Sequence, residues 1–298
     1  MTYLDIDTLL ISGGGINSIS SLGCLKYLID NNLIDKELKI FKNIIGVSGG
    51  LIHILPIIVG YTIDETIDLY IKVDINNYLP DISLKYLLDN YGIYDNSIIK
   101  HITELILKHK NINKKINLLD LYKLTKKNIY FKTINITREK VLFINHKNYP
   151  NLLLSDALCM TSAAPPIFKP IKYKNNMYID GGFCGNFPFD KENKYKKYIG
   201  INITINHLHR NRFQKNKNKN KNKINNLLDY LKLLFKLSGT QLRESDNKNR
   251  IININLTGSG LNFKEKNKKK NEILNLGYKK TYEHFNNIIE GIHNHKSQ

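Results

Sequence analysis

The sequence predicts an α/β protein with a mainly parallel central sheet. Two short apolar runs, residues 8–11 and 43–47, each end in a glycine-rich turn that leads into apolar residues at helical spacing. Consecutive strand–loop–helix units of this kind are typical of parallel sheets covered by helices. The chain has 298 residues, of which 42% are hydrophobic and 24% charged, so it can bury a large core.

The first two helices are expected at residues 16–28 and 51–60. The stretch 44–61 is apolar, but it contains several glycines, His53 and Pro56, and it barely reaches the ~20 residues that cross a bilayer. We therefore interpret it as a buried strand followed by a buried helix, and we expect no transmembrane span.

A helical block is expected next, at about residues 62–127. Thr62 and Glu65 have the spacing of a capping box, and Asp95 precedes a second run of apolar residues at helical spacing. This block therefore interrupts the series of strands.

Strands resume after the block. Residues 130–136 alternate with period two, and a short turn separates them from a second apolar run. Pro165 and Pro166 end a helical pattern. We expect strands at 130–136, 141–144 and 198–205, a helix at 152–163 and short extended pieces within 167–179, and we expect the sheet to be complete by residue 205.

Three segments are expected in the chain as a whole. Residues 1–210 form the α/β core, and residues 211–223 form a mobile loop because they are almost entirely lysine and asparagine. Residues 224–298 form a C-terminal helical region packed on the core. Within it we expect a helix near 224–237, a strand near 251–256 and an amphipathic helix at 272–289.

The charge of the chain is strongly positive. Lys and Arg number 45 against 26 Asp and Glu, which gives a net charge of +19. Most of the cations are lysines, whereas proteins that read nucleic acids favour arginine for bidentate contacts. Nucleic-acid binding is therefore disfavoured, and peripheral contact with an anionic membrane surface fits the charge at least as well.

The N-terminus and the cysteines indicate a reducing compartment. Asp5 and Asp7 stand where a secretion signal would be basic, so we expect no signal peptide and an intracellular protein, cytoplasmic or peripheral to a membrane. Cys24, Cys159 and Cys184 are far apart and have no metal-binding spacing, so we expect neither disulfides nor a metal site or other cofactor.

One motif has the pattern of a nucleophile elbow. The residues from Gly46 to Gly50 read Gly-Val-Ser-Gly-Gly, a G-x-S-x-G sequence between a predicted strand and a predicted helix. Glycines at Gly46, Gly49 and Gly50 allow the sharp turn that would present the Ser48 hydroxyl at a helix N-terminus. Serine between glycines also occurs in ordinary turns.

A second glycine motif lies at the end of the first strand. Gly13, Gly14 and Gly15 precede a helix, so their free N–H groups suit a phosphate or an oxyanion, and a plain tight turn is the alternative. A dinucleotide fingerprint would need glycine where Ser18 stands, and no Gly-Lys-Ser/Thr ending follows to form a P-loop.

A third motif, Asp180-Gly181-Gly182, follows a short extended run. By itself an Asp-Gly-Gly sequence at a strand end is typical of a turn.

The order and spacing of the three motifs resemble the patatin-like phospholipase family. Ser155-Asp-Ala, the segment Thr161 to Pro170 and Asn186-Phe-Pro188 are also similar to that family, and the resemblance covers about residues 8–205. It implies a three-layer α/β/α fold and a lipid acyl hydrolase with a dyad of Ser48 as nucleophile and Asp180 as general base. It further implies an oxyanion hole at Gly13–Gly15, an acyl-serine intermediate and a lipid ester substrate.

The chain departs from the family pattern at Ser12, Asn17 and Ser18, which leaves a catalytically weakened lipid- or membrane-binding module as an alternative. A Ser-His-Asp esterase is a second alternative, with His207 or His209 as the histidine. His53 is interpreted as a packed histidine of the elbow helix.

Overall fold

The computed structural model describes residues 4–73, 83–188, 195, 197–205, 224, 226–238, 248–256 and 267–296. An eight-stranded mixed sheet forms its centre, with strand order β5-β6-β3-β2-β1-β7-β8 and β4 paired to β3 beside this path. The strands are β1 (Thr8–Ile11), β2 (Asn43–Gly46), β3 (Asn128–Asn135), β4 (Lys140–Ile144), β5 (Ile171–Tyr173), β6 (Asn176–Asp180), β7 (Tyr198–Ile205) and β8 (Ile251–Leu256).

The central strands are parallel, as the strand–loop–helix units predict. β1 pairs in parallel with β2 and with β7, and β2 pairs in parallel with β3. β4, β5 and β6 run antiparallel to their neighbours. The carboxyl ends of β1 and β2 therefore meet at one edge of the sheet, where the two glycine motifs begin.

The sheet is not complete at residue 205, contrary to expectation. β8 pairs in parallel with β7 along its whole length, from Gly200 opposite Ile251 to Ile205 opposite Leu256. The C-terminal region thus adds a strand to the core as well as two helices, α8 (Leu227–Ser238) and α9 (Asn267–Lys296). The predicted loop at 211–223 lies outside the described residues.

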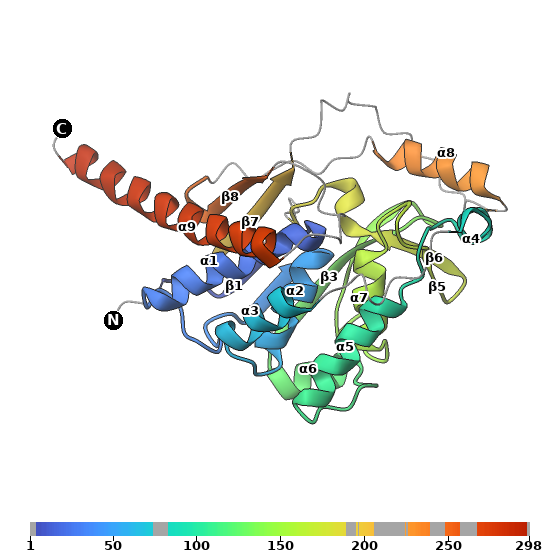
Figure 1. Ribbon diagram of the computed structural model, residues 1–298, viewed down its shortest axis with the longest axis horizontal. Helices are drawn as coiled ribbons and strands as arrows, with labels where there is room; N and C mark the ends of the chain where they lie inside the picture. Colours follow the sequence, from blue (N-terminus) through green and yellow to red (C-terminus); the bar gives the residue numbers. More distant parts are fainter. Residues whose placement is uncertain are drawn as a thin grey trace.

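The main hydrophobic core lies between the sheet and helices of one face. Side chains on alternate strand positions, such as Leu9 and Ile11, point into it, whereas Leu10 points to the opposite face. The helices that contribute buried residues to this core include α1 (Ile19–Asp30), α2 (Gly49–Ile58), α7 (Leu154–Ser162) and α9. On the opposite face α8 packs through Tyr230, Leu233 and Leu234. Helices therefore surround the sheet, as Figure 1 shows.

The helical block between β2 and β3 is present. It contains α3 (Ile63–Lys72), α4 (Leu84–Asn90), α5 (Ser97–His109) and α6 (Leu118–Thr125). Thr62 and Glu65 form the predicted capping box of α3. α5 begins at Ser97, two residues after the predicted start at Asp95. The Asp95 carboxylate accepts the N–H of Ser97, the first residue of the helix.

The C-terminal helix α9 crosses α1 at close range (Figure 1). A Cβ atom on Gly23 of α1 would overlap the Leu274 carbonyl, and one on Gly277 of α9 would overlap the Ser20 carbonyl. The two glycines thus let the helix backbones touch. At the start of α9, the ammonium group of Lys270 donates to the carbonyls of Tyr70 and Val73 and so caps α3.

Candidate active site

Ser48 occupies a strained turn between β2 and α2. Its backbone has φ 50° and ψ −132°, in a region that residues with a side chain rarely adopt. Such strain persists only where the surrounding structure enforces it, and it is concentrated at functional sites. The turn places Ser48 immediately before the N-terminus of α2, where backbone N–H groups point outward.

The glycines around Ser48 are required by close approach. A Cβ on Gly46 would come within 2.5 Å of the Leu51 side chain, and one on Gly50 would overlap the carbonyl oxygen of Ser12. A Cβ on Gly13 would lie 3.1 Å from the Cβ of Ser48. The elbow and the first glycine loop therefore pack directly against each other.

Asp180 ends β6 beside this elbow. Its backbone N–H donates to the Ala163 carbonyl at 3.0 Å, and its carboxylate accepts the Gly182 N–H at 2.6 Å. The Ser48 side chain lies close enough to the same carboxylate to lower its pKa. The structure thus brings all three sequence motifs together, although Ser48 and Asp180 lie far apart in the chain.

The environment of Asp180 makes its carboxylate more basic than that of an exposed aspartate. The side chain is buried, and the net pKa rises from 3.8 to about 6, with loss of hydration as the largest cause. The hydrogen bonds from Ser48 and Gly182 and the positive charge of Lys132 lower the pKa and oppose this rise. Asp180 is therefore ionised above about pH 6 and can accept a proton there.

The three glycines of the first loop are not equivalent. The Gly13 N–H donates to the Asn186 carbonyl at 3.3 Å, and the Asn186 side chain donates to the Gly13 carbonyl at 2.7 Å. Within the part of the chain that the structure describes, the N–H groups of Gly14 and Gly15 have no protein acceptor. Of the predicted oxyanion hole, Gly14 and Gly15 are therefore available to a ligand and Gly13 is engaged in holding the loop.

Two residues without a predicted function, Thr161 and Lys132, support Ser48 and the turn after Asp180. The Ser48 N–H donates to the Thr161 hydroxyl at 3.0 Å, and that hydroxyl donates to the Lys132 carbonyl at 2.6 Å. Lys132 is fully buried and its ammonium group donates to the Gly185 carbonyl. Lys132 carries no sequence signal, and Thr161 only begins the segment that resembles the family, because each residue acts through neighbours that the tertiary structure provides.

The glycines after Asp180 are also restricted by their neighbours. A Cβ on Gly181 would overlap the Lys132 carbonyl, and one on Gly182 would lie 2.9 Å from Oδ1 of Asn186. The Asp-Gly-Gly sequence therefore lets the turn after Asp180 pack against β3 and against the segment that holds Gly13.

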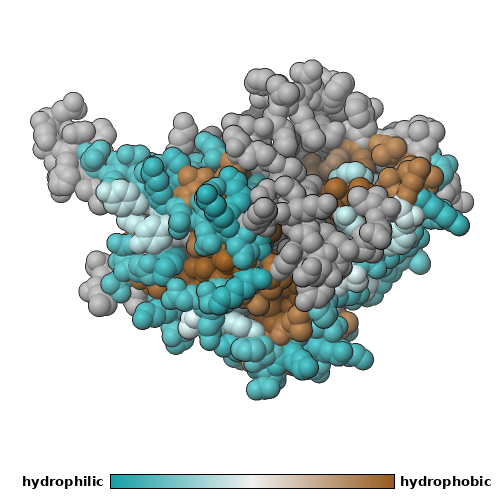
Figure 2. Space-filling view, viewed as in Figure 1, coloured by the Kyte–Doolittle hydropathy of each residue, from teal (hydrophilic) through white to brown (hydrophobic). Residues whose placement is uncertain are grey.

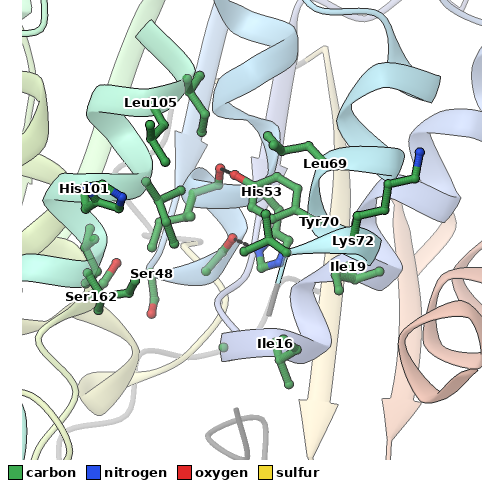
Figure 3. A pocket seen from close by; sticks show the side chains of 18 of the residues that line it. Ile16, Ile19, Ser48, His53, Leu69, Tyr70, Lys72, His101, Leu105 and Ser162 are labelled. Atoms are coloured by element: carbon green, nitrogen blue, oxygen red, sulfur yellow. Dashed lines mark hydrogen bonds between the residues drawn. The ribbon is translucent and has the colours of Figure 1, made fainter. Parts of the chain in front are cut away.

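A cavity of about 820 Å³ opens beside Ser48. Its walls are mostly apolar, and Figure 3 shows Ser48 at one side with Leu69 and Leu105 on the opposite wall. In Figure 2 apolar side chains gather between α3 and α5, the two helices that form much of this wall. The apolar residues that line the cavity include Ile16, Ile19, Ile52, Leu69, Val73, Ile98, Ile99, Ile102, Leu105, Ile106 and Phe168.

His53 lines this cavity as a packed, neutral histidine. Its Nδ1 lies 2.7 Å from the Gly49 carbonyl, which requires a proton on that nitrogen, and its ring lies 4.4 Å from the ring of Tyr70. Burial lowers the pKa of His53 to about 4. The prediction of a packed histidine is confirmed, whereas His207 and His209 lie outside the described residues.

The three departures from the family pattern are accommodated inside the fold. The Ser12 hydroxyl accepts the Ile203 N–H at 2.7 Å, so it ties the loop to β7. The Asn17 N–H donates to the Gly14 carbonyl at 3.0 Å, and the Asn17 side chain is buried. Ser18 is fully buried between Gly14 and Gly49. The loop is therefore held without a basic residue at position 17.

The described residues contain no group of three His, Cys, Asp or Glu side chains that could hold a metal ion. None of the described helices combines the length and the apolar character that a bilayer crossing needs. The three cysteines are buried, and none of them forms a disulfide.

Comparison with known proteins identifies relatives of this chain. The sequence model of the family described as "Patatin-like phospholipase" matches residues 9–191. An uncharacterized protein of Acanthamoeba polyphaga mimivirus is 27% identical over 231 residues, which are 76% of this chain and 73% of the relative. A "probable lipid hydrolase" of Invertebrate iridescent virus 6 is 33% identical over 192 residues, 63% of each protein.

Among solved structures, VipD from Legionella pneumophila has a similar fold. The TM-score is 0.65 and the alignment covers 95% of this chain and 67% of VipD. The sequences are 14% identical, so this likeness concerns the fold.

Proposed function

The chain belongs to the patatin-like phospholipase family, and on this premise we propose that it hydrolyses carboxylic esters of lipids with Ser48 as nucleophile and Asp180 as general base. One observation carries the proposal: the Ser48 side chain lies close enough to the Asp180 carboxylate to lower its pKa, at a strained elbow beside the glycine loop. A serine hydroxyl becomes an effective nucleophile when a base within hydrogen-bond reach removes its proton.

The reaction begins when Ser48 Oγ attacks the ester carbonyl carbon while Asp180 accepts the hydroxyl proton. The carbonyl oxygen becomes an oxyanion, and the N–H groups of Gly14 and Gly15 stabilise it. When the intermediate collapses, the C–O bond breaks and Asp180 gives its proton to the leaving alcohol. Water, deprotonated by Asp180, then attacks the acyl carbon. The bond between this carbon and Ser48 Oγ breaks, Asp180 returns the proton to Ser48 Oγ, and the fatty acid leaves.

The direct contact between base and nucleophile favours a dyad over a triad. The groups that act on Asp180 within the described residues are Ser48, Gly182 and Lys132, and no histidine is among them. The buried His53 donates to Gly49 and does not bridge the two catalytic residues. This arrangement supports proton transfer from Ser48 to Asp180 in one step.

The apolar cavity supports a long acyl chain as the acid part of the substrate. A volume of about 820 Å³ lies within the range of ligand sites, and burial of each methylene group contributes about 0.8 kcal/mol. Most of the lining residues come from the glycine loop, α2, α3 and α5, which supports a role for the helical block in the access of the acyl chain. Among the described residues, those of α8 and α9 do not line the cavity.

The positive charge supports peripheral contact with an anionic membrane, where the lipid substrate would be found. The net charge of +19 makes such contact sensitive to salt. Cosedimentation with anionic and with neutral vesicles at low and high salt tests it, with duplex DNA as competitor. Salt-sensitive binding to anionic vesicles that DNA does not reverse is expected, and equal binding to neutral vesicles would contradict it.

The catalytic proposal is tested by labelling with a fluorophosphonate probe and by hydrolysis of a short-chain ester and a phospholipid. We expect both activities in the wild type, and we expect their loss in Ser48→Ala and Asp180→Asn. Ser162→Ala is the matched control, because Ser162 is a second serine of the same cavity, and His207→Ala tests the triad; both should retain activity.

Two results would count against this function. Label retained in Ser48→Ala would place the nucleophile elsewhere. A folded wild type that takes no label and hydrolyses neither substrate, yet binds vesicles, would favour a lipid-binding module over an enzyme.

A further inference from the structure

We propose that Lys132 is a positioning residue of this site: its buried ammonium group holds the turn after Asp180 and keeps the Asp180 carboxylate ionised for proton transfer. The inference rests on the function proposed above, because it assigns a role toward the same general base.

The position of Lys132 in the sheet places it between the two halves of the dyad. β3 pairs on one side with β2, where Gly46 before the elbow lies opposite Phe131. It pairs on the other side with β6, where Asp180 lies opposite Thr133. Lys132 thus stands on β3 between the residue that faces the elbow and the residue that faces the base.

The main chain of Lys132 supports the nucleophile. Its carbonyl accepts the Thr161 hydroxyl at 2.6 Å, and the same hydroxyl accepts the Ser48 N–H at 3.0 Å. This two-bond connection fixes the backbone of a residue with strained φ and ψ.

The side chain of Lys132 supports the base. It is fully buried, and its ammonium group donates to the carbonyl of Gly185, the residue that follows the turn Gly181–Cys184. A Cβ on Gly181 would also lie 3.0 Å from the Lys132 Cγ, so the side chain packs along this turn. The orientation of the Asp180 carboxylate depends on the same turn, through the Gly182 N–H.

The charge of Lys132 acts on Asp180 where water is largely excluded, and there an opposite charge favours the ionised carboxylate. The positive charge lowers the pKa of Asp180 against the rise caused by burial. The other groups that act on this carboxylate are the Ser48 hydroxyl and the Gly182 N–H. On α7, which packs against β6, the acidic side chain is Asp156, and it pairs with Lys100 at 2.7 Å.

A second buried lysine at the start of the same strand provides a matched control. Lys127 precedes β3 and its ammonium group donates to the carbonyls of Leu38 and Phe41. It therefore shares burial and carbonyl partners with Lys132, but it lies at the opposite end of β3 from Asp180.

The test is the rate of fluorophosphonate labelling of Ser48 as a function of pH, from about pH 5 to 9, in the wild type and in Lys132→Gln, Lys132→Met, Lys132→Arg and Lys127→Met. Gln retains a donor for the Gly185 carbonyl without the charge, and Arg retains the charge. Because loss of a nearby cation raises the pKa of a carboxylate, the acidic limb of the pH–rate profile should move to higher pH in the Gln and Met variants. A rise of about one unit lowers the rate near pH 6 about fivefold and leaves the rate near pH 9 almost unchanged.

The Lys132→Arg and Lys127→Met variants should keep the acidic limb of the wild-type pH–rate profile. A Thr161→Val variant should lower the rate at every pH without moving the limb, since it breaks only the connection to the Ser48 backbone. The proposal would be overturned if the acidic limb lay at the same pH in the wild type and in a folded Lys132→Gln variant. If neither neutral variant folds, a limb moved upward in Lys132→Arg would overturn it. A wild type without any labelling would instead contradict the proposed catalytic function.

Discussion

Replacing Asp180 with asparagine should abolish activity and yet stabilise the fold at neutral pH. The side chain is 6% exposed, and its pKa is raised from 3.8 to about 6. A difference of one pKa unit between folded and unfolded states corresponds to about 1.4 kcal/mol. The ionised carboxylate therefore destabilises the folded state by about 3 kcal/mol at pH 8, in the net effect of burial, hydrogen bonds and Lys132.

The pH dependence has a definite sign. Because the folded-state pKa is the higher one, proton binding stabilises the fold; this stabilisation is complete below about pH 3.8 and is lost as the pH rises through about 6. Asparagine is neutral at every pH and retains an acceptor oxygen for the Gly182 N–H. The free energy of unfolding of Asp180→Asn should thus exceed that of the wild type by up to about 3 kcal/mol at pH 8 and by about half as much at pH 5.

Urea unfolding followed by far-ultraviolet circular dichroism measures this difference, since the chain has no tryptophan for fluorescence. Asp89→Asn, at an exposed position of α4, is the control and should show no such pH-dependent gain. An Asp180→Asn variant that is less stable than the wild type at pH 8, or a difference that does not change with pH, would refute the reasoning.

Two further substitutions test the cavity and the helix crossing. Ile102→Phe narrows the cavity and should lower kcat/KM for long-chain esters about tenfold relative to kcat/KM for short-chain esters. Leu124→Phe, at an exposed site away from the cavity, is the control and should leave this ratio unchanged. An unchanged ratio in both variants would show that acyl chains bind elsewhere. Gly277→Ala places a methyl group against the Ser20 carbonyl and should lower the free energy of unfolding by about 1 to 3 kcal/mol. Urea unfolding measures this change, with Asn275→Ala at an exposed position of the same helix as the control. Equal stability of the two variants would contradict the close crossing.

Much of the fold could be predicted because its strands carry local signals. β1 and β7 match their predicted ranges, since β1 is a short apolar run that ends at a glycine-rich turn and β7 alternates isoleucine with glycine or polar residues. The role of β8 could not be predicted in the same way. Its residues indicate a strand, but no local signal tells that it extends the sheet beyond β7.

In the candidate site, too, local patterns could be predicted from the sequence and tertiary contacts could not. Gly-x-Ser-x-Gly, the glycine loop and Asp-Gly-Gly are local patterns, and the structure brings them together around Ser48 and Asp180. Lys132 was missed because the alternation of residues 130–136 gives no reason to bury a lysine. The structure buries five consecutive residues of β3, from Phe131 to Asn135, since that strand is covered on both faces. Residues that act through a neighbour's backbone leave no pattern in the sequence.

The crossing of α1 and α9 has a consequence for biosynthesis. The Cys24 thiol donates to the carbonyl of Gly277, which lies 253 residues downstream. During translation, the face of α1 that α9 covers therefore stays exposed to solvent until α9 has left the ribosome. The glycine loop that leads into α1, and α3 with its Lys270 cap, receive their final support at the same late moment. A nascent chain can form the elbow early, but the cavity beside Ser48 gains the support of α9 only after Lys270 and Gly277 have been synthesised.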